Sequence, residues 1–226
     1  RFGSSTLRNA RHHVGKQVVL KLDILQFFDS IRYSTVKDKV FPEEIYAEPL
    51  RILLTMLCYH KDALPQGAPS SPAITNIILY EFDELIGQWC RERDITYTRY
   101  CDDMTFSGDF DPAEVIRFVR LELKKLGFLL NEQKTRIQRP GQQQSVTGIV
   151  VNEKISIPAD YRRKLRQELY YCRKFGIQEH LQKIGLEIPE EMYRMRLLGK
   201  INYVLQVHPD DKDMLDARKW LQQSTK

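Results

Sequence analysis

The stretch Val18-Val19-Leu20-Lys21-Leu22-Asp23-Ile24-Leu25 decides the fold. It is a nearly continuous apolar run rich in β-forming residues, and it predicts a buried strand. A carboxylate is rarely buried without a partner or a metal ion, so Asp23 is the first candidate functional residue. A second acidic site, Cys101-Asp102-Asp103, lies between two β-type runs at 95–100 and 104–107. That pattern predicts a hairpin with acids at its tip.

Helical and strand patterns alternate on both sides of these runs up to about residue 157. Ser34 opens a short helix, and longer helices are predicted over 47–59, 71–91 and 111–127. Short strands are predicted at 128–130 and 135–137, with a further hairpin over 146–157. From Pro158 onward the pattern is helical only, with helix starts at Pro189 and Pro209. The sequence therefore predicts an α+β body followed by a helical segment.

Composition excludes several classes of protein. The chain has 226 residues, of which 42% are apolar and 29% charged, which excludes a disordered, collagen-like or coiled-coil chain. The four cysteines form no metal-binding spacing and are expected to be reduced thiols. No apolar run approaches the ~18 residues that a membrane span needs, so we expect no membrane partner. Because the first residue is Arg1 and not Met, we expect a fragment whose true N-terminus is missing.

The positive charge is small and localised. The net charge is only +5, and most of the excess falls after residue 155. Arg162, Arg166 and Arg173 are spaced to share one face of a predicted helix, and we expect that face opposite the apolar stripe of Tyr161, Leu165, Leu169 and Cys172. Such a face suits phosphate groups, although an ordinary solvated helix surface would give the same pattern.

The three acids suggest a metal site. If the strands that carry Asp23 and Asp102-Asp103 are neighbours, three carboxylates meet at one edge of a sheet, where their mutual repulsion is costly. Divalent cations would relieve that cost, and an all-oxygen ligand set favours Mg²⁺ or Mn²⁺. Two such ions ~3.5–4 Å apart catalyse phosphoryl displacement in polymerases and nucleases. The alternative is an acidic pair in an ordinary turn.

A series of motifs in fixed order resembles the bacterial retron reverse transcriptases. Residues 22–31 (LDILQFFDSI) resemble motif A, the Gln66-Gly67 loop with Ser71-Pro72 resembles motif B, and Tyr100-Cys101-Asp102-Asp103 resembles motif C. Residues 131–134 resemble motif D. Residues 9–13 (NARHH) match the NAxxH element of retron enzymes, and residues 146–148 match their VTG element. The resemblance covers the chain from about residue 5 to its end.

The resemblance implies a right-hand polymerase fold of α+β class. Its palm would be an antiparallel, ferredoxin-like sheet with packed helices, followed by an all-helical thumb. The expected parts are a remnant of the fingers at 1–16, palm at 17–33, fingers and palm helices with the motif B loop at 34–70, palm at 71–157 and thumb at 158–226.

The resemblance also implies roles for single residues. Asp23 and Asp102 would hold two Mg²⁺ ions, or Mn²⁺, with the carbonyl of Ile24 as a further ligand and Asp103 beside them. Phe28 would be the aromatic steric gate against a ribose 2′-hydroxyl, or else a core residue. Gln66 and Gly67 would contact the nucleotide or template, although Gly67 could serve only a turn. Lys134 would neutralise or protonate the leaving pyrophosphate, or be a solvated surface lysine.

Nucleic-acid contacts follow from the same resemblance. Arg162, Arg163, Arg166 and Arg173 of the thumb would follow the phosphates of a template–primer duplex. Asn9 and His13 would touch RNA, or be structural residues.

The implied activity is RNA-directed DNA synthesis of the retron type. Nucleotides from dNTPs would be added to a 2′-OH or 3′-OH of the enzyme's own structured RNA. The implied partners are template RNA, an RNA–DNA duplex and an effector protein, in a prokaryotic cytoplasm. Two alternatives stay open: a group II intron-like or phage-defence reverse transcriptase, and a catalytically silent member of this fold that only binds RNA.

Overall fold

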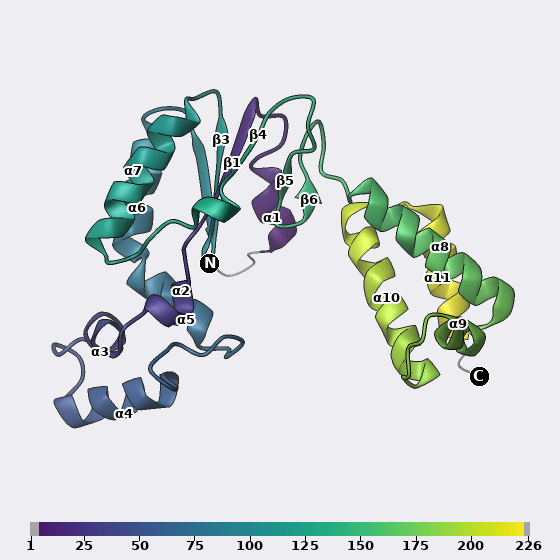
Figure 1. Ribbon diagram of the computed structural model, residues 1–226, viewed down its shortest axis with the longest axis horizontal. Coiled ribbons are helices and arrows are strands. Elements are labelled where there is room, and N and C mark those ends of the chain that lie inside the picture. The colour runs from purple at the N-terminus through teal and green to yellow at the C-terminus, as the bar shows by residue number, and fades with distance from the viewer. Residues whose placement is uncertain (1–4, 224–226) are drawn as a thin grey trace. The chain divides into compact units, whose positions relative to one another are not determined.

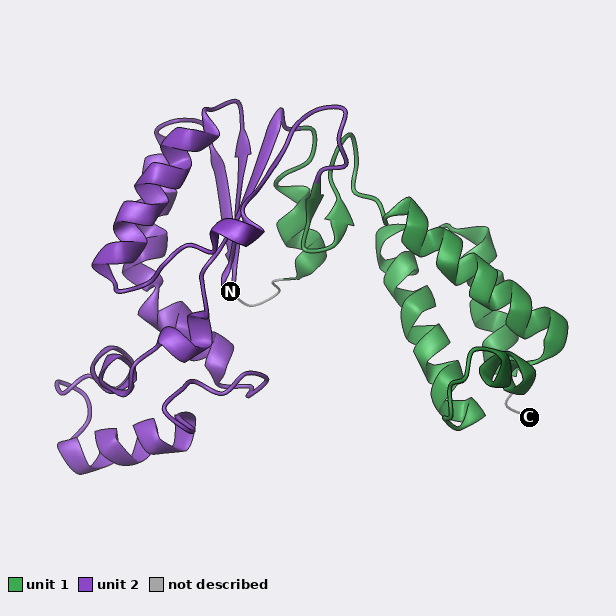
Figure 2. Ribbon diagram, viewed as in Figure 1, with its two compact units in different colours: residues 1–15, 145–226 green, residues 16–144 purple. Residues whose placement is uncertain are grey.

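The computed structural model describes residues 5–223, which form two compact units (Figures 1 and 2). Residues 16–144 form one unit. The described residues up to 15, together with those from 145 onward, form the other.

The unit of residues 16–144 is built on a four-stranded antiparallel sheet. Its strands are β1 (Val18–Asp23), β2 (Thr96–Tyr100), β3 (Asp103–Gly108) and β4 (Arg136–Gln138), in the order β2-β3-β1-β4. The predicted strand at 18–25 is confirmed as far as Asp23, and both of its faces are buried. The register pairs Val18 with Gly108 at one end of β1 and Asp23 with Asp103 at the other.

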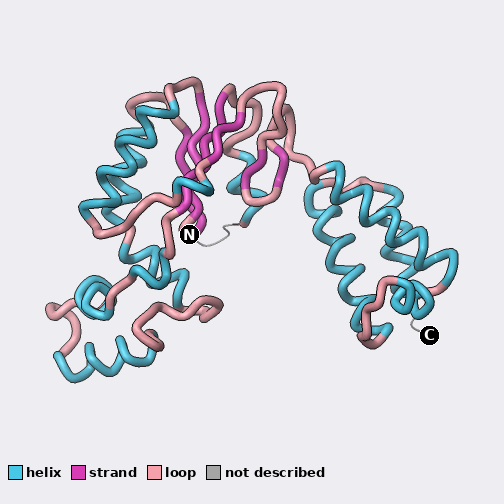
Figure 3. The backbone as a smooth tube through the Cα atoms, viewed as in Figure 1, coloured by secondary structure: helices cyan, strands magenta, loops and turns pink. Residues whose placement is uncertain are grey.

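Helices α6 (Tyr80–Arg91) and α7 (Pro112–Lys125) lie along one side of this sheet (Figures 1 and 3). Asp111 caps α7 as its position before Pro112 predicts, because its carboxylate accepts from the backbone N–H of Ala113 at 3.0 Å. Leu20 and Leu22 of β1 share one hydrophobic core with Phe106 of β3 and with residues of both helices. The sheet is thereby fixed to a helical layer that supports its two central strands.

Several elements differ from the predicted ones. The single helix expected over 71–91 is two helices, α5 (Ser71–Ile78) and α6, which meet at Leu79 (φ −94°, ψ 10°). The chain after β1 forms a short helix, α2 (Phe27–Ser30), that was not among the predicted elements. Residues 128–130 form no strand, although Leu130 makes an isolated bridge to Ile24. A short 3₁₀ helix, η1 (Glu132–Lys134), follows.

Helix α4 (Glu48–Cys58), which follows α3 (Tyr33–Val40), buries the polar residues Arg51 and Thr55 and exposes most of its apolar residues. Arg51 is buried and donates to the carboxylates of Asp38 and Glu48, both at 2.8 Å, and to the carbonyl of Phe41 at 2.7 Å. The opposite face exposes large apolar side chains: Leu50, Ile52, Leu53, Met56 and Leu57. The buried guanidinium is tolerated because each of these donors has an acceptor.

As far as residue 223, the second unit consists of a small N-terminal part, a short hairpin and four C-terminal helices. The helices are α8 (Ala159–Phe175), α9 (Ile177–Lys183), α10 (Glu190–Val207) and α11 (Lys212–Gln223), around a core that includes Leu169, Leu197 and Leu221. The starts predicted from Pro189 and Pro209 lie at Glu190 and Lys212, and α9 was not predicted.

The compact units do not follow the boundary expected at residue 157. The hairpin of β5 (Ser145–Val146) and β6 (Ile149–Val150) groups with α1 (Thr6–Arg11) and the helical segment. The N–H of Gly15 donates to the carbonyls of Val151 and Asn152 at 3.0 and 2.9 Å, and Leu7 packs against the helical core. These contacts attach the N-terminal residues to the C-terminal half of the chain.

Within residues 5–223, no helix is both long enough and apolar enough to cross a membrane.

Candidate active site

The sheet brings the predicted acids to one end of its two central strands. Asp23 is the last residue of β1 and Asp103 the first of β3, and the two are directly paired. Residues paired across antiparallel strands have side chains on the same face. Asp102 precedes Asp103 at the hairpin tip, and its carbonyl accepts from the N–H of Ile24 at 3.3 Å. The expectation that the two acidic strands are neighbours is therefore confirmed.

Asp23 is almost completely buried, with 5% of its surface exposed. Lys134 of η1 donates from Nζ to Oδ2 of Asp23 at 3.0 Å, and Nδ2 of Asn131 lies 3.3 Å from Oδ1. The backbone N–H of Asn131 also donates to the carbonyl of Asp23 at 2.8 Å. The hydrogen bond and the charge of Asp23 raise the pKa of Lys134, so this lysine stays cationic beside the acids.

The acids form an electronegative end of the sheet. Partial burial raises the pKa of Asp102, and the nearby charges of Asp23 and Asp103 act in the same direction. Among the described residues, no group of three acidic, histidine or cysteine side chains is already gathered as a metal site. The positive charge that pairs with Asp23 is the ammonium group of Lys134. An all-oxygen donor set that already attracts a cation suits Mg²⁺ or Mn²⁺.

A buried ion pair holds the hairpin that carries Asp102 and Asp103. Arg99 of β2 forms two hydrogen bonds with the carboxylate of Asp83 on α6 and donates from Nη1 to the carbonyl of Cys101 at 2.8 Å. Cys101 itself has a φ of +54°, a conformation that is uncommon for a residue with a side chain. Sequence reasoning missed Arg99 and Asp83. The signal available was a charged residue three positions before Asp102, inside a β-type run.

Phe27 and Phe28 of motif A follow Asp23 closely in the chain, and a backbone hydrogen bond joins them to the start of the motif B loop. Phe27 is buried and Phe28 half-buried, their rings in edge-to-face contact at 5.7 Å. The carbonyl of Phe28 accepts from the N–H of Leu64 at 3.3 Å, so α2 is tied to the start of the motif B loop. In that loop Gln66 is exposed. Gly67 has a φ of +88° with open space where a Cβ would lie, so its backbone angle and not crowding favours glycine.

The predicted arginine face is placed differently from expectation. Arg162, Arg166 and Arg173 share a side of α8, but that side lies against α11 and not opposite the apolar stripe. Arg162 pairs with Asp211, Arg166 lies 3.7 Å from Asp213, and Arg173 lies over the ring of Trp220 at 5.3 Å. Long arginine stems can cover apolar surface, which explains a position beside the buried stripe. Arg163 is exposed and makes no ion pair within residues 5–223.

Asn9 and His13 do not lie together on one surface. Asn9 is half-buried in α1, where its carbonyl accepts from the N–H of His12 at 3.2 Å. His13 is fully buried in the unit that contains the C-terminal helices. The structural interpretation of His13 is therefore favoured over direct contact with RNA.

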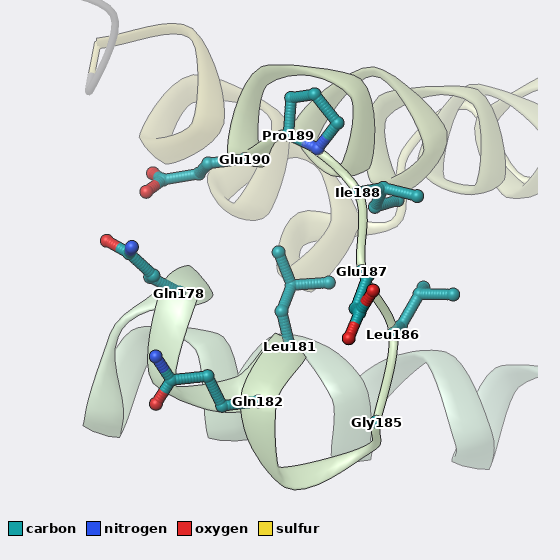
Figure 4. Close-up of a pocket in the computed structure, with 9 residues that line it drawn as sticks. All are labelled: Gln178, Leu181, Gln182, Gly185, Leu186, Glu187, Ile188, Pro189 and Glu190. Atoms are coloured by element: carbon teal, nitrogen blue, oxygen red, sulfur yellow. The ribbon is translucent and has the colours of Figure 1, made fainter.

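A cavity of about 500 Å³ lies between α9 and the start of α10 (Figure 4). The residues that line it include the acids Glu187 and Glu190 and the amides Gln178 and Gln182, but no arginine or lysine. Its charge therefore does not suit a phosphate, and none of the predicted site residues lines it.

An antiparallel sheet with paired acids at the junction of a strand end and a hairpin tip is the arrangement of a nucleic-acid polymerase palm. A family model described as reverse transcriptase (RNA-dependent DNA polymerase) matches residues 1–151. The chain belongs to this family.

Curated relatives are retron enzymes. The retron Mx65 reverse transcriptase of Myxococcus xanthus is 32% identical over 238 residues, which cover 96% of this chain and 52% of the relative. The retron Ec86 reverse transcriptase of Escherichia coli is 34% identical over 184 residues, which cover 79% of this chain and 57% of the relative. The resemblance to retron enzymes is thus confirmed, and the chain spans about half the length of these relatives.

A solved structure supports the fold. The foamy viral protease–reverse transcriptase in complex with double-stranded DNA aligns with a TM-score of 0.52 and 14% identity, over 90% of this chain and 30% of that one. At this identity the likeness concerns the fold alone, and it confirms the predicted fold class.

Proposed function

We propose that this protein is an RNA-directed DNA polymerase of the retron type, which adds nucleotides from dNTPs to a 2′-OH or 3′-OH of its own structured RNA. The observation that carries the proposal is the pairing of Asp23 with Asp103 and the position of Asp102 beside them. Carboxylates at one end of a sheet can hold the divalent cations that stabilise the attacking and leaving oxygens in nucleotidyl transfer.

The proposed cofactor is a pair of Mg²⁺ ions, which Mn²⁺ could replace. Asp23 and Asp102 would hold them, with the carbonyl of Ile24 and the carboxylate of Asp103 as further oxygen ligands. The ions would supply charge stabilisation for the attacking and leaving oxygens. Lys134 makes its ion pair with the same carboxylate, so it would have to leave Asp23 when a metal is bound and would then be available to the leaving pyrophosphate.

The remaining site residues would orient the nucleotide. The half-buried ring of Phe28 packs against buried Phe27 and is thereby held in place, as a steric gate against a 2′-hydroxyl requires. Gln66 is exposed on a loop whose base is fixed by a hydrogen bond from the Ser71 hydroxyl to the carbonyl of Pro65 at 2.7 Å. Gln66 and Gly67 would contact the nucleotide or the template.

Helix α8 would bind the phosphate backbone of the template–primer duplex. Arg163 and Lys164 are exposed and would meet phosphates directly. Arg166 is also exposed, whereas Arg162 and Arg173 are engaged with α11 and would contribute through the positive field of the helix. Asn9 stays a proposed RNA contact.

The proposed setting is the prokaryotic cytoplasm, with template RNA, an RNA–DNA duplex and an effector protein as partners. The similarity to retron reverse transcriptases favours a retron-type enzyme over a group II intron-like one.

The test is incorporation of dNTPs by the 226-residue chain on an RNA template with a primer, with and without Mg²⁺. We expect Asp102→Asn and Asp103→Asn to abolish incorporation, whereas Asp109→Asn, at an exposed acid just beyond β3, leaves it unchanged. Binding of Mn²⁺, followed by electron paramagnetic resonance, gives a second readout and should weaken in the first two variants only.

Each outcome separates the proposals. Activity that survives both substitutions contradicts the metal assignment. Tight binding of RNA without incorporation and without Mn²⁺ binding supports a silent RNA-binding module.

A further inference from the structure

Three rings are stacked at the C-terminal end of α8. The ring of Tyr171 stacks on Phe175 (centroids 6.2 Å apart, planes at 22°) and on His180 of α9 (6.2 Å, 12°). We call Phe175, Tyr171 and His180 the ring column. Gly176, at φ +89°, lets the chain turn between the two helices and so brings His180 beside Tyr171.

The ring column runs from the surface into the protein. Phe175 is 43% exposed, Tyr171 is half-buried and His180 is only 7% exposed. An exposed phenylalanine at a helix end would ordinarily be a loose hydrophobic side chain. Here it is one end of a stack, and its plane is set by the rings behind it.

A partly buried hydrogen-bond network fixes the inner end of the column. The His180 Nε2 atom lies 3.1 Å from the hydroxyl of Tyr193, which donates to Glu168 at 2.5 Å. Lys200 closes the network with hydrogen bonds of 2.7 and 2.8 Å to the same carboxylate. Burial raises the pKa of Tyr193, and Glu168 adds to the effect, so the phenol stays a neutral donor. The column is therefore preorganised before any ligand arrives.

Cations surround the exposed end. The Lys174 Nζ atom lies 5.2 Å from the centroid of Phe175 and 5.6 Å from that of Tyr170, which is itself exposed. Lys183 of α9 lies 5.9 Å from the centroid of Phe175 and 5.5 Å from that of Tyr171. Neither lysine makes an ion pair within residues 5–223. Both ammonium groups lie over the Phe175 ring, and Lys174 also donates to the hydroxyl of Tyr170 at 3.3 Å. Each lysine side chain would therefore move off the ring to meet an anion beside it.

We propose that the exposed end of the ring column binds an unpaired base of a single-stranded nucleic acid. The base stacks on Phe175 in place of the ammonium groups of Lys174 and Lys183, which move from the ring to the flanking phosphates. A fixed aromatic surface flanked by cations is the combination with which proteins bind single strands, since every base has a face that stacks. A base pair inside a duplex does not offer a free face. The site therefore selects unpaired segments, such as those beside the stems of a structured RNA.

This site is separate from the acids and needs neither a metal ion nor a dNTP. Only the choice of RNA as the natural source of the unpaired base rests on the proposed function. The chemistry itself accepts RNA or DNA, and the test must distinguish them.

The probe is a 12-nucleotide RNA with 2-aminopurine at its centre, because the fluorescence of this base falls when it stacks. The same sequence as DNA, and the RNA paired with its DNA complement, are the comparison ligands. The proteins are the 226-residue wild type, Phe175→Leu, which keeps an apolar side chain without a ring, and Phe175→Trp, which restores one. Met195→Ala removes an exposed apolar side chain of α10 outside the column and is the matched control.

We expect Phe175→Leu to weaken binding of the single strand by about tenfold or more and to lose the quenching, while duplex binding changes little. Phe175→Trp should restore both, and Met195→Ala should behave as wild type. Replacing Lys174 and Lys183 together by Gln should make the negative slope of log K against log salt shallower by about 1.4 for the single strand. A preference for RNA over DNA identifies the source.

Equal single-strand binding and quenching in wild type and Phe175→Leu would overturn the proposal, as would a loss in Phe175→Leu that the Trp variant does not restore. The thermal unfolding midpoint of each variant is compared with that of the wild type, so that a folding defect can be told from a loss of binding. The polymerase proposal is tested separately. If the wild type stacks the base but incorporates no dNTPs, only the polymerase proposal is refuted. If it incorporates dNTPs but does not stack the base, only the base-stacking proposal is refuted.

Discussion

The ion pair of Arg99 and Asp83 yields a quantitative prediction about the hairpin that carries the acids. The Arg99 side chain is 4% exposed and that of Asp83 30%. Removing one partner of a buried pair leaves an unpaired charge, which costs about 3–5 kcal/mol. Asp83→Ala leaves the buried Arg99 guanidinium unpaired, so we expect a loss of about 3–5 kcal/mol in the free energy of unfolding. Arg99→Met leaves Asp83, which water reaches, so we expect a loss at the lower end, about 3 kcal/mol.

The double variant separates the pair from its surroundings. Arg99→Met combined with Asp83→Ala leaves no charge behind, so its loss should be smaller than the sum of the two single losses, by about 2 kcal/mol. Tyr97 donates to Asp83 at 2.7 Å, and Tyr97→Phe removes only this neutral donor. It should cost about 1 kcal/mol and is the control for general disturbance around Asp83.

The assay uses urea and tryptophan fluorescence. The two tryptophans, Trp89 and Trp220, lie in different compact units. In a Trp220→Phe background, fluorescence therefore reports only the unit that contains the ion pair. If the double variant loses as much unfolding free energy as Arg99→Met and Asp83→Ala together, the two residues are not coupled and the reasoning is refuted.

A second readout connects the pair to the site. Arg99 donates to the carbonyl of Cys101, so Arg99→Met should loosen the turn before Asp102 and weaken Mn²⁺ binding. Tyr97→Phe should leave Mn²⁺ binding unchanged. Equal Mn²⁺ affinity in all these variants would show that the hairpin does not depend on Arg99.

Three shorter predictions concern other residues. Lys134→Gln should raise the affinity for Mn²⁺ severalfold, measured by calorimetry, because the competing ammonium no longer pairs with Asp23; a weaker affinity would contradict this competition. Phe28→Ala should raise incorporation of ribonucleotides relative to deoxynucleotides in primer extension, and an unchanged ratio would remove the gate role. Burial raises the pKa of Cys90 to about 12 and that of Cys172 to about 11, so at pH 8 both remain thiols and should resist a thiol-specific reagent until the protein unfolds.

The sequence predicted most accurately what periodicity and local signals control. The buried strand to Asp23, the hairpin around Cys101 and the capped helix after Asp111 are confirmed because each is specified by adjacent residues. The pairing of Asp23 with Asp103 was expected only on the condition that two strands are neighbours. The resemblance to a polymerase motif order supplied that condition, which periodicity could not.

The remaining features depend on contacts between distant segments. The helical spacing of Arg162, Arg166 and Arg173 was correct, yet their side faces α11 because Asp211, Asp213 and Trp220 lie there, about 50 residues later in the chain. The hydrogen bonds of Asn131 and Lys134 to Asp23 span more than 100 residues. No local pattern carries such information.

The six-pair register between β1 and β3 has a consequence for how this chain can vary. Successive side chains of a strand point to opposite faces, so a slip by one residue would send Asp103 to the other side of the sheet from Asp23. Substitutions within either strand can be absorbed one at a time, but the deletion of a single residue changes the alignment of the ladder beyond it. Natural and engineered length variation should therefore be concentrated in the loops and not between Val18 and Asp23 or between Asp103 and Gly108.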